Sequence, residues 1–295
     1  MTTRAVSVVI PHYGDPRHAR VLVDDVLAQD GIDALQVVVV DDASPTPYPE
    51  APDPRVSVVR RTTNGGFGSA VNAGAALASH PWLLICNSDV RLAPDVLRRL
   101  LDATPPGALT GPAVRTSGAV ERTGRRFPTA GRVALARVRV LQRFHHRPWF
   151  LRAIGVDLDA VPGTVSDVDW LAGVVMLLPT SVFRAAGGFD PSFFMYCEET
   201  DLQRRLADAG VPRLLVGTVE VDHVGGASSD PDRAQSWLTS SQLRYADKWG
   251  GRRRLRAALR TVAAVNLATA VARRLAGRPT HPFAEVRREL RDLSG

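Results

Sequence analysis

The chain has 295 residues, of which 45% are hydrophobic; this excludes disorder as the main state and leaves ample material for a core. Two cysteines, Cys86 and Cys197, exclude a disulfide framework and lack the clustering of a zinc site. The net charge of +7 suits an anionic partner, and apolar stretches such as 171–179 are too short to span a bilayer. We expect a soluble, cytoplasmic chain without a signal peptide.

The first hundred residues alternate between predicted strands and predicted helices. Each strand is a short run rich in Val, Ile and Leu, and each helix carries apolar side chains at helical spacing. This order indicates βαβ units and therefore an α/β fold with a mainly parallel central sheet flanked by helices. The predicted strands are 5–11, 35–40, 55–60 and 81–86, and the predicted helices are 17–29, 68–79 and one from 93–94.

Polar residues follow these strands directly. The strand Leu83–Cys86 reads as buried on both faces, yet Asn87, Ser88 and Asp89 come next. In parallel sheets, ligands lie beyond the carboxyl ends of the strands. We therefore expect the segments after these strands to share one crevice: 11–15, 41–44, 62–68 and 87–89.

The second half is less regular. The basic stretch 132–152 shows no clear pattern, which leaves a loop over the site as one interpretation. An apolar run at 170–178, a helix at 198–209 and a strand at 213–221 follow. We expect one domain over residues 1–250 and a basic helical tail over 251–295.

Three polar clusters in the second half stand at predicted element ends: Asp169, Glu198-Glu199 and His223. Each by itself has an ordinary structural explanation, such as a helix cap or a turn. Asp89 with His223, however, offers an oxygen and a nitrogen ligand that suit Mg²⁺ or Mn²⁺ beside a diphosphate. A nearby Glu could then act as a base on an incoming hydroxyl.

The glycine-rich stretch NGGFGSAVNAG, residues 64–74, does not complete the dinucleotide-binding fingerprint, because Val71 occupies the position of its third glycine. It also lacks the Gly-Lys-Ser/Thr of a P-loop. The remaining interpretation is a loop and helix N-terminus near phosphate. On that basis three residues become donor-binding candidates: Asn64, Gly68 and Asn72.

Several short motifs in this order resemble family 2 glycosyltransferases with the GT-A fold, especially bacterial rhamnosyltransferases. The resemblance covers about residues 5–250. The motifs are VSVVIPHYG, VVVVDDAS, NGGFGSAVNAG, LLICNSDV, DWLAGVVMLLPTSVFRAAGGFD, FFMYCEETDLQRRL and HVGGAS.

The resemblance implies an inverting transfer of a sugar from a nucleotide-diphosphate donor to a glycan or lipid-linked acceptor in cell-envelope polysaccharide synthesis. The first donor to consider is dTDP-rhamnose, ahead of uridine-linked galactofuranose, glucose or galactose. The transition state would have oxocarbenium character, and the site must exclude water. By the same analogy four residues border the nucleoside: Pro11, Tyr13, Asp41 and Asp42.

The remaining roles also follow from the resemblance. Asn87-Ser88-Asp89 stands at the family's D-x-D motif, so Asp89 would hold the metal and diphosphate, and His223 would also meet them. Glu199 stands at the catalytic base. Two departures matter: Asn87 replaces the first acid, and a base that is Glu instead of Asp reaches one methylene further, which keeps Glu198 as the alternative base.

Asp169 and Trp170 are assigned to the acceptor side, where Trp170 and the stretch 132–152 would exclude water. The alternative to this role is that Trp170 is an ordinary core residue.

Between Arg252 and Arg278 the tail has eight arginines and no acid, around a 12-residue apolar stretch that is too short to span a membrane. It suits peripheral contact with an anionic membrane at the inner face of the cell, or a basic helix packed on the domain. Two other classes stay in view: an inactive nucleotide-sugar-binding scaffold, and a nucleic-acid-binding protein. The 6% aromatic content and the lack of a recognition motif argue against nucleic acid.

Overall fold

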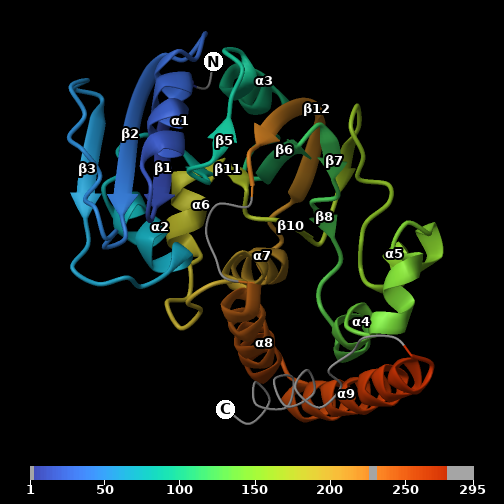
Figure 1. The fold of residues 1–295 in the computed structure, drawn as a ribbon. Helices are drawn as coiled ribbons and strands as arrows, with labels where there is room; N and C mark the ends of the chain where they lie inside the picture. The colour runs from blue at the N-terminus through green and yellow to red at the C-terminus, as the bar shows by residue number, and fades with distance from the viewer. Residues whose placement is uncertain (1–2, 226–230, 278–295) are drawn as a thin grey trace. The chain divides into compact units, whose positions relative to one another are not determined.

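The computed structural model describes residues 3–225 and 231–277. The chain divides into two compact units (Figure 1). One unit comprises residues up to Arg125 together with the chain from Asp159 onward to the end of the sheet; we call it the sheet unit. The other comprises Arg126–Leu158 and the C-terminal helices; we call it the helical unit. This division differs from the boundary expected at residue 250.

The sheet unit is built on one large mixed sheet. Its strand order is β3-β2-β1-β4-β11-β6-β12-β5, with β7 and β9 paired at its side, while β8 and β10 form a separate pair. The strands are β1 (Ala5–His12), β2 (Ala34–Asp41), β3 (Val56–Arg60), β4 (Trp82–Cys86), β5 (Val90–Arg91), β6 (Leu109–Thr116), β7 (Ala119–Glu121), β8 (Gly124–Arg125), β9 (Val165–Asp167), β10 (Trp170–Leu171), β11 (Val175–Pro179) and β12 (Arg213–His223).

The parallel part of the sheet, β3-β2-β1-β4, follows the βαβ pattern of the sequence. Its strands run in parallel registers that set His12 beside Asp41 and Asp41 beside Arg60. β11 then joins β4 in the antiparallel direction, with Val175 opposite Cys86. The carboxyl end of β4 therefore lies where β11 begins, in the middle of the sheet.

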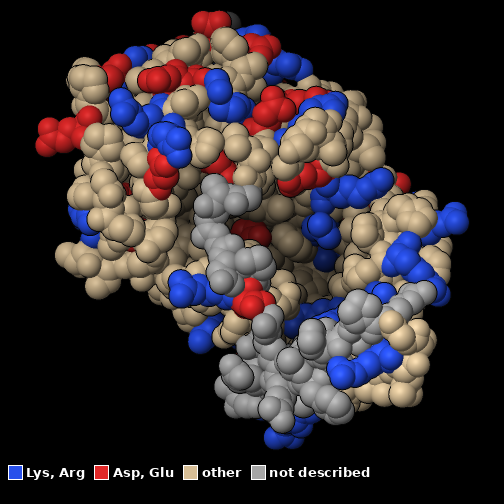
Figure 2. Space-filling view, viewed as in Figure 1, with Lys and Arg blue, Asp and Glu red and all other residues tan. Residues whose placement is uncertain are grey.

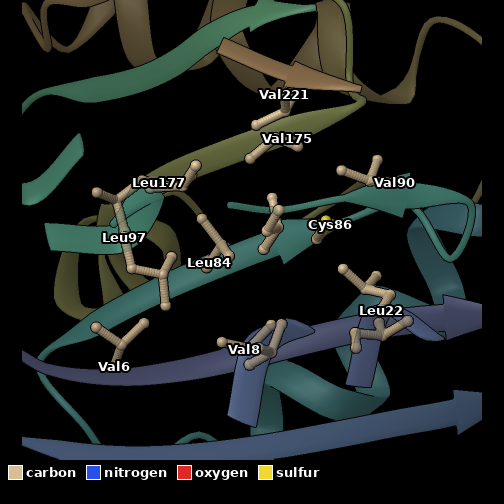
Figure 3. Close-up of a cluster of buried hydrophobic side chains, with 14 of the residues drawn as sticks. Val6, Val8, Leu22, Leu84, Cys86, Val90, Leu97, Val175, Leu177 and Val221 are labelled. Atoms are coloured by element: carbon tan, nitrogen blue, oxygen red, sulfur yellow. The ribbon is translucent and has the colours of Figure 1, made fainter. Parts of the chain in front are cut away.

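Helices cover both faces of this sheet (Figure 1). They are α1 (Arg17–Leu27), α2 (Phe67–Ala76), α3 (Val96–Ala103), α6 (Thr180–Ala185) and α7 (Glu198–Asp208). Alternating strand residues feed the two cores, because successive side chains of a strand point to opposite faces. Val8 and Ile10 belong to the core with α1 and α3, which Figure 3 shows, whereas Val9 belongs to the core with α2, α6 and α7.

Two predicted elements differ from the structure in a way that affects the site. The apolar run 170–178 is two strands, β10 and β11, separated by residues 172–174. The strand predicted to end at residue 221 continues to His223, because β5 pairs with its last two residues.

The described residues of the helical unit form α4 (Ala130–Ala136), the 3-10 helix η1 (Arg139–Phe144), α5 (Pro148–Ala153), α8 (Pro231–Lys248) and α9 (Arg252–Leu275). Its small core joins Val133 of α4 to Leu243 of α8 and to Leu255 and Leu259 of α9. The basic stretch 132–152 is thus mainly helical and packs with α8 and α9, so the loop interpretation was wrong.

Helix α9 carries the predicted tail. Asn266 on it is buried; its Oδ1 accepts from the backbone N–H of Arg139 at 3.0 Å, and its Nδ2 donates to the carbonyl of Arg137 at 3.1 Å. Among the described residues, α9 is the one helix that passes a length and composition test for crossing a membrane. The sequence expectation counted only the 12 apolar residues, but the helix continues through the flanking arginines to 24 residues.

Candidate active site

The carboxyl end of β4 brings Asp89 next to His223. Asp89 Oδ1 lies 3.2 Å from His223 Nε2, and both side chains are about one-sixth exposed, at 17% and 16%. The sheet positions this pair, because β5, which follows Asp89, pairs with the last residues of β12. The predicted meeting of these two residues from distant parts of the chain is therefore present in the structure.

Each member of this pair shifts the other's pKa. Burial raises the pKa of Asp89, but the hydrogen bond and charge of His223 outweigh it and hold that pKa below its ordinary value. The Asp89 hydrogen bond is the main cause of the raised pKa of His223. Each side chain thus favours the charged form of the other; as a metal ligand, His223 would be the neutral imidazole.

The other ring nitrogen of His223 faces Glu121, a residue that the sequence analysis did not select. Glu121 Oε1 lies 3.6 Å from His223 Nδ1 and accepts a hydrogen bond from Thr116. A carboxylate on the second nitrogen of a metal-binding histidine fixes the ring's orientation. No motif marks Glu121; it reaches the site because β7 pairs with β6.

Asn87 and Ser88 form the turn that leads to Asp89. The Asn87 N–H donates to the carbonyl of Val174 at 2.9 Å, which ties the turn to the start of β11. The Asn87 Oδ1 atom is buried and finds no partner among the described residues. Ser88, which stands between Asn87 and Asp89 in the sequence, is half-buried.

This donor set fits a hard divalent cation. A buried amide oxygen without a partner, one carboxylate and one imidazole nitrogen suit Mg²⁺ or Mn²⁺ that completes its shell with phosphate oxygens and water. No group of three His, Cys, Asp or Glu side chains that could hold a metal ion occurs in the part of the chain that the structure describes. The site could thus hold a cation shared with a ligand, not a closed structural metal.

Glu198 and Glu199 open helix α7 immediately after two residues with strained backbone. Tyr196 and Cys197 have φ of 69° and 65°, in the left-handed region that residues other than glycine rarely adopt. Such strain is typical of functional sites, where it aims side chains. Directly after these two residues, Glu198 is buried and Glu199 is half-buried in the sheet unit.

The two glutamates face different neighbours. A Cβ at Gly68, on α2, would lie 3.5 Å from the Glu198 Cβ, whereas a Cβ at Gly173 would lie 3.4 Å from the Glu199 Cβ. Glu198 is thus on the side of the glycine-rich loop. Glu199 is on the side of the β10–β11 turn, whose next residue, Val174, holds Asn87.

Both glutamates have raised pKa values. Burial is the main cause for each, and the charge of Glu199 raises the pKa of Glu198 further. The Oε2 atom of each is buried and has no partner among the described residues. A carboxylate with a raised pKa and an open acceptor atom is suited to take a proton from a hydroxyl.

Asp41 and Asp42 shape the loops beyond β2. Asp41 accepts from the N–H groups of Ser44 at 2.8 Å and Tyr48 at 3.0 Å, and pairs with Arg60. Burial raises the pKa of Asp41, but these hydrogen bonds outweigh it and lower that pKa overall.

Asp42 in turn holds the glycine-rich loop. It accepts from the N–H of Gly66 at 2.8 Å and pairs with Arg61. Asp41 and Asp42 are both buried, and their hydrogen bonds hold the loops that follow β2 and β3 in place. The sequence analysis missed Arg60 and Arg61. The signal available was that Asp41-Asp42 and Arg60-Arg61, two pairs of opposite charge, stand at the ends of β2 and β3, which are neighbours in the sheet.

The other donor-side candidates have distinct positions. Pro11 is buried in β1, and Tyr13 just beyond it is 51% exposed. Asn64 Oδ1 accepts from the Gly66 N–H at 3.1 Å, and Gly68 packs against Phe189 and Glu198. Asn72 exchanges hydrogen bonds of 2.8 and 2.9 Å with the backbone of Phe189, so its amide connects α2 to the loop before α7.

Of the two residues predicted to face the acceptor, Asp169 directly precedes β10 and Trp170 begins it. Trp170 is half-buried and pairs with Arg125 of β8. The next residue, Leu171, exchanges hydrogen bonds of 2.7 and 2.8 Å with the Gln203 side chain of α7. Trp170 is therefore fixed beside the helix that begins with Glu198 and Glu199.

A continuous set of contacts thus joins these residues. Asp42 holds Gly66; a Cβ on Gly66 would lie 1.7 Å from the carbonyl oxygen of Phe194, so the loop closely approaches the segment before α7. Helix α7 then reaches the β10–β11 turn, and that turn reaches Asn87. The glycine-rich loop, the Asp89–His223 pair and the two glutamates of α7 are therefore connected within the sheet unit.

Solved structures with this arrangement of elements are glycosyltransferases. The mannosyltransferase PcManGT from Pyrobaculum calidifontis, solved with GDP-Man and Mn²⁺, matches 95% of this chain and 77% of its own, with a TM-score of 0.60 and 18% identity. GalNAc-T7, solved with UDP, GalNAc and Mn²⁺, matches 99% of this chain and 55% of its own, with a TM-score of 0.61 and 14% identity. These likenesses show the GT-A fold.

Sequence comparison identifies the family. The model of glycosyl transferase family 2 matches residues 7–145. The N-acetylglucosaminyl-diphospho-decaprenol L-rhamnosyltransferase of Mycobacterium tuberculosis is 30% identical over 239 residues, which cover 74% of this chain and 76% of that protein. The chain therefore belongs to glycosyl transferase family 2 and is a glycosyltransferase.

Proposed function

We propose that this glycosyltransferase moves a sugar, rhamnose first, from a nucleotide-diphosphate donor to a hydroxyl of a lipid-linked glycan, with inversion at the anomeric carbon. The observation that carries the proposal is the connected set of residues that includes Asp89, His223 and Glu199. The similar mycobacterial rhamnosyltransferase acts, by its name, on a decaprenol-linked diphosphate sugar, which supports a lipid-linked acceptor and a role in cell-envelope synthesis.

The donor would lie along the glycine-rich loop with its diphosphate toward Asp89. Asn87, Asp89 and His223 would hold Mg²⁺ or Mn²⁺, which would offset the charge that develops on the departing diphosphate. Asp42 keeps the loop in place through Gly66. Tyr13, which is half-exposed beyond β1, would border the nucleoside together with the buried residues Pro11 and Asp41.

Glu199 would take the proton of the acceptor hydroxyl as that oxygen attacks the anomeric carbon. Its place against the β10–β11 turn puts it on the same side as Trp170 and Asp169, which we assign to the acceptor. Burial raises the pKa of Glu199, which would suit it to take that proton. A single base and no enzyme nucleophile are sufficient for an inverting transfer.

The first experiment is a thermal-shift panel of nucleotide diphosphates and nucleotide sugars, each with and without Mg²⁺ or Mn²⁺, followed by a turnover assay with the donor that binds. A ligand that binds the folded state raises its melting temperature. We expect a cation-dependent shift with dTDP-rhamnose, and loss of both the shift and turnover in Asp89→Ala.

Two outcomes would contradict the proposal. A folded protein that shows no shift with any donor would not be a nucleotide-sugar transferase. Binding without turnover, in the presence of lipid-linked acceptors, would favour a nucleotide-sugar-binding scaffold.

A further inference from the structure

Within the helical unit, η1 and α5 carry a cluster of exposed basic and aromatic side chains. We call residues 139–152 the aromatic-basic segment. Arg143, His145, His146 and Arg147 are exposed on it, and Trp149 is 55% exposed. Tryptophan and arginine together are typical of surfaces that meet a partner, because both side chains are enriched at interfaces.

The exposed tryptophan is held by neighbouring rings. Phe150 is fully buried, and its ring centroid lies 5.6 Å from that of Trp149. The Phe144 ring lies 5.5 Å from Trp149 on another side, and the Arg143 guanidinium lies 4.7 Å from the Phe144 ring centroid. This row of contacts runs from the core to an exposed cation, so it presents Trp149 in a fixed position.

The charge of the helical unit is strongly positive. Its described residues, 126–158 and 231–277, include 16 arginines and one lysine but only three acids. Two of these acids are paired: Asp157 with Arg126 at 2.9 Å and Asp247 with Arg252 at 3.0 Å. In Figure 2, blue side chains without red ones lie on the surface over α5.

We propose that the aromatic-basic segment binds the surface of an anionic lipid membrane. Arginine side chains are attracted to anionic headgroups, and tryptophan favours the interface between headgroups and acyl chains. Exposed aliphatic side chains in the same unit, Val140, Val265 and Leu275, favour lipid over nucleic acid, because they cannot stack on bases. This inference does not depend on the transfer reaction.

The test is flotation of the full chain with two kinds of vesicle: phosphatidylcholine alone, and phosphatidylcholine with one third phosphatidylglycerol. We expect binding to the anionic vesicles and not to the neutral ones. Arg147→Glu should weaken that binding at least about fivefold, since a basic residue near an anionic surface contributes on the order of one kilocalorie per mole.

Arg244→Glu is the matched control, because Arg244 is exposed on α8 in the same unit and its replacement changes the net charge equally. We expect it to weaken binding much less than Arg147→Glu does. Equal weakening by the two variants would show a response to overall charge alone and would overturn the assigned segment. Tighter binding to a duplex oligonucleotide than to the anionic vesicles would overturn it in favour of nucleic acid.

A second variant tests insertion of the ring without disturbing its packing. Trp149→Phe keeps an aromatic ring against Phe144 and Phe150. Anionic vesicles with brominated acyl chains should quench part of the wild-type tryptophan fluorescence and a smaller part in Trp149→Phe. Equal fractional quenching would contradict contact between Trp149 and the bilayer. Both variants should keep the wild-type melting-temperature shift with a nucleotide-sugar donor, which separates this proposal from the proposed reaction.

Discussion

The sheet unit and the helical unit have opposite charges. The described residues of the sheet unit, 3–125 and 159–225, contain 16 arginines and 23 acids, whereas those of the helical unit contain 17 basic residues and three acids. The net charge of +7 for the whole chain therefore describes neither of them. Composition alone pointed to an anionic partner for the chain, but the excess of positive charge belongs to one unit.

The charged groups are also used differently in the two units. In the sheet unit, Asp41 and Glu198 are buried: Asp41 accepts hydrogen bonds from a loop, and burial raises the pKa of Glu198. In the helical unit, cations such as Arg143 and Arg147 are exposed. Buried carboxylates with shifted pKa values indicate chemistry, whereas exposed cations indicate attraction to a surface. The following predictions test this contrast, from the largest expected effect to the smallest.

Glu199→Gln should lower the rate of sugar transfer by about 10²- to 10⁴-fold, because the amide cannot accept the acceptor proton. Donor binding and flotation with anionic vesicles should stay at the wild-type level. Initial rates at saturating donor and acceptor measure the effect.

Glu198→Gln is the comparison for that variant. Because Glu198 faces Gly68 and not the β10–β11 turn, its replacement should reduce the rate less. A larger loss in Glu198→Gln than in Glu199→Gln would transfer the role of base to Glu198.

Gly66→Ala should destabilise the sheet unit by about 3 kcal/mol or more, because strain and overlap combine there. Gly66 has φ of 83°, and an added Cβ would lie 1.7 Å from the Phe194 carbonyl oxygen. Denaturant unfolding gives the change in the free energy of unfolding, and the variant should also lose donor binding.

The matched substitution in the helical unit is Gly131→Ala. Gly131 is in α4, and nothing lies within 4 Å of an added Cβ. Its replacement should stabilise the protein by about 0.5–1 kcal/mol, since alanine restricts the unfolded chain. Destabilisation by both variants to the same extent would mean that close packing is not confined to the loop around Gly66.

The buried glutamates predict a pH-dependent stability. Burial raises the pKa of Glu198 and Glu199 in the folded protein. Their contribution to stability is therefore complete below the unfolded pKa, near 4.3, and is lost as the pH rises through the raised folded values. Glu198→Gln/Glu199→Gln should remove that loss, so its melting temperature should fall less than the wild-type value from mildly acidic to alkaline pH. Parallel curves for the two proteins would contradict the raised pKa values.

Much of the fold could be predicted from the sequence. The alternation of Val-rich runs with amphipathic segments indicated β1 to β4 and the helices between them, because these patterns reflect local burial. The residues beyond parallel strands could also be assigned to one edge, and the meeting of Asp89 with His223 followed from the motif order. The roles assigned to individual site residues stay predictions.

Other features could not be predicted. The break at Gly173, which places a turn against Glu199, lies inside a run that is apolar throughout. Glu121 reaches His223 only because a short edge strand pairs with β6. The arginine-rich stretch 132–152 shows no clear periodicity in the sequence. Its helices are short, and α4 is stabilised by packing against α8 and α9, which a local pattern does not reveal.

The sequence by itself determined the family's motifs, the order of the elements in the sheet unit and the residues that stand at the ends of its strands, because local patterns of burial are written in neighbouring residues. Only the tertiary structure decided how the charges are divided. Residues 126–158 and the C-terminal helices are far apart in the chain and form one core through Val133, Leu243 and Leu259. Contacts between such distant segments depend on packing, so the sequence showed two basic segments but not that they form one unit.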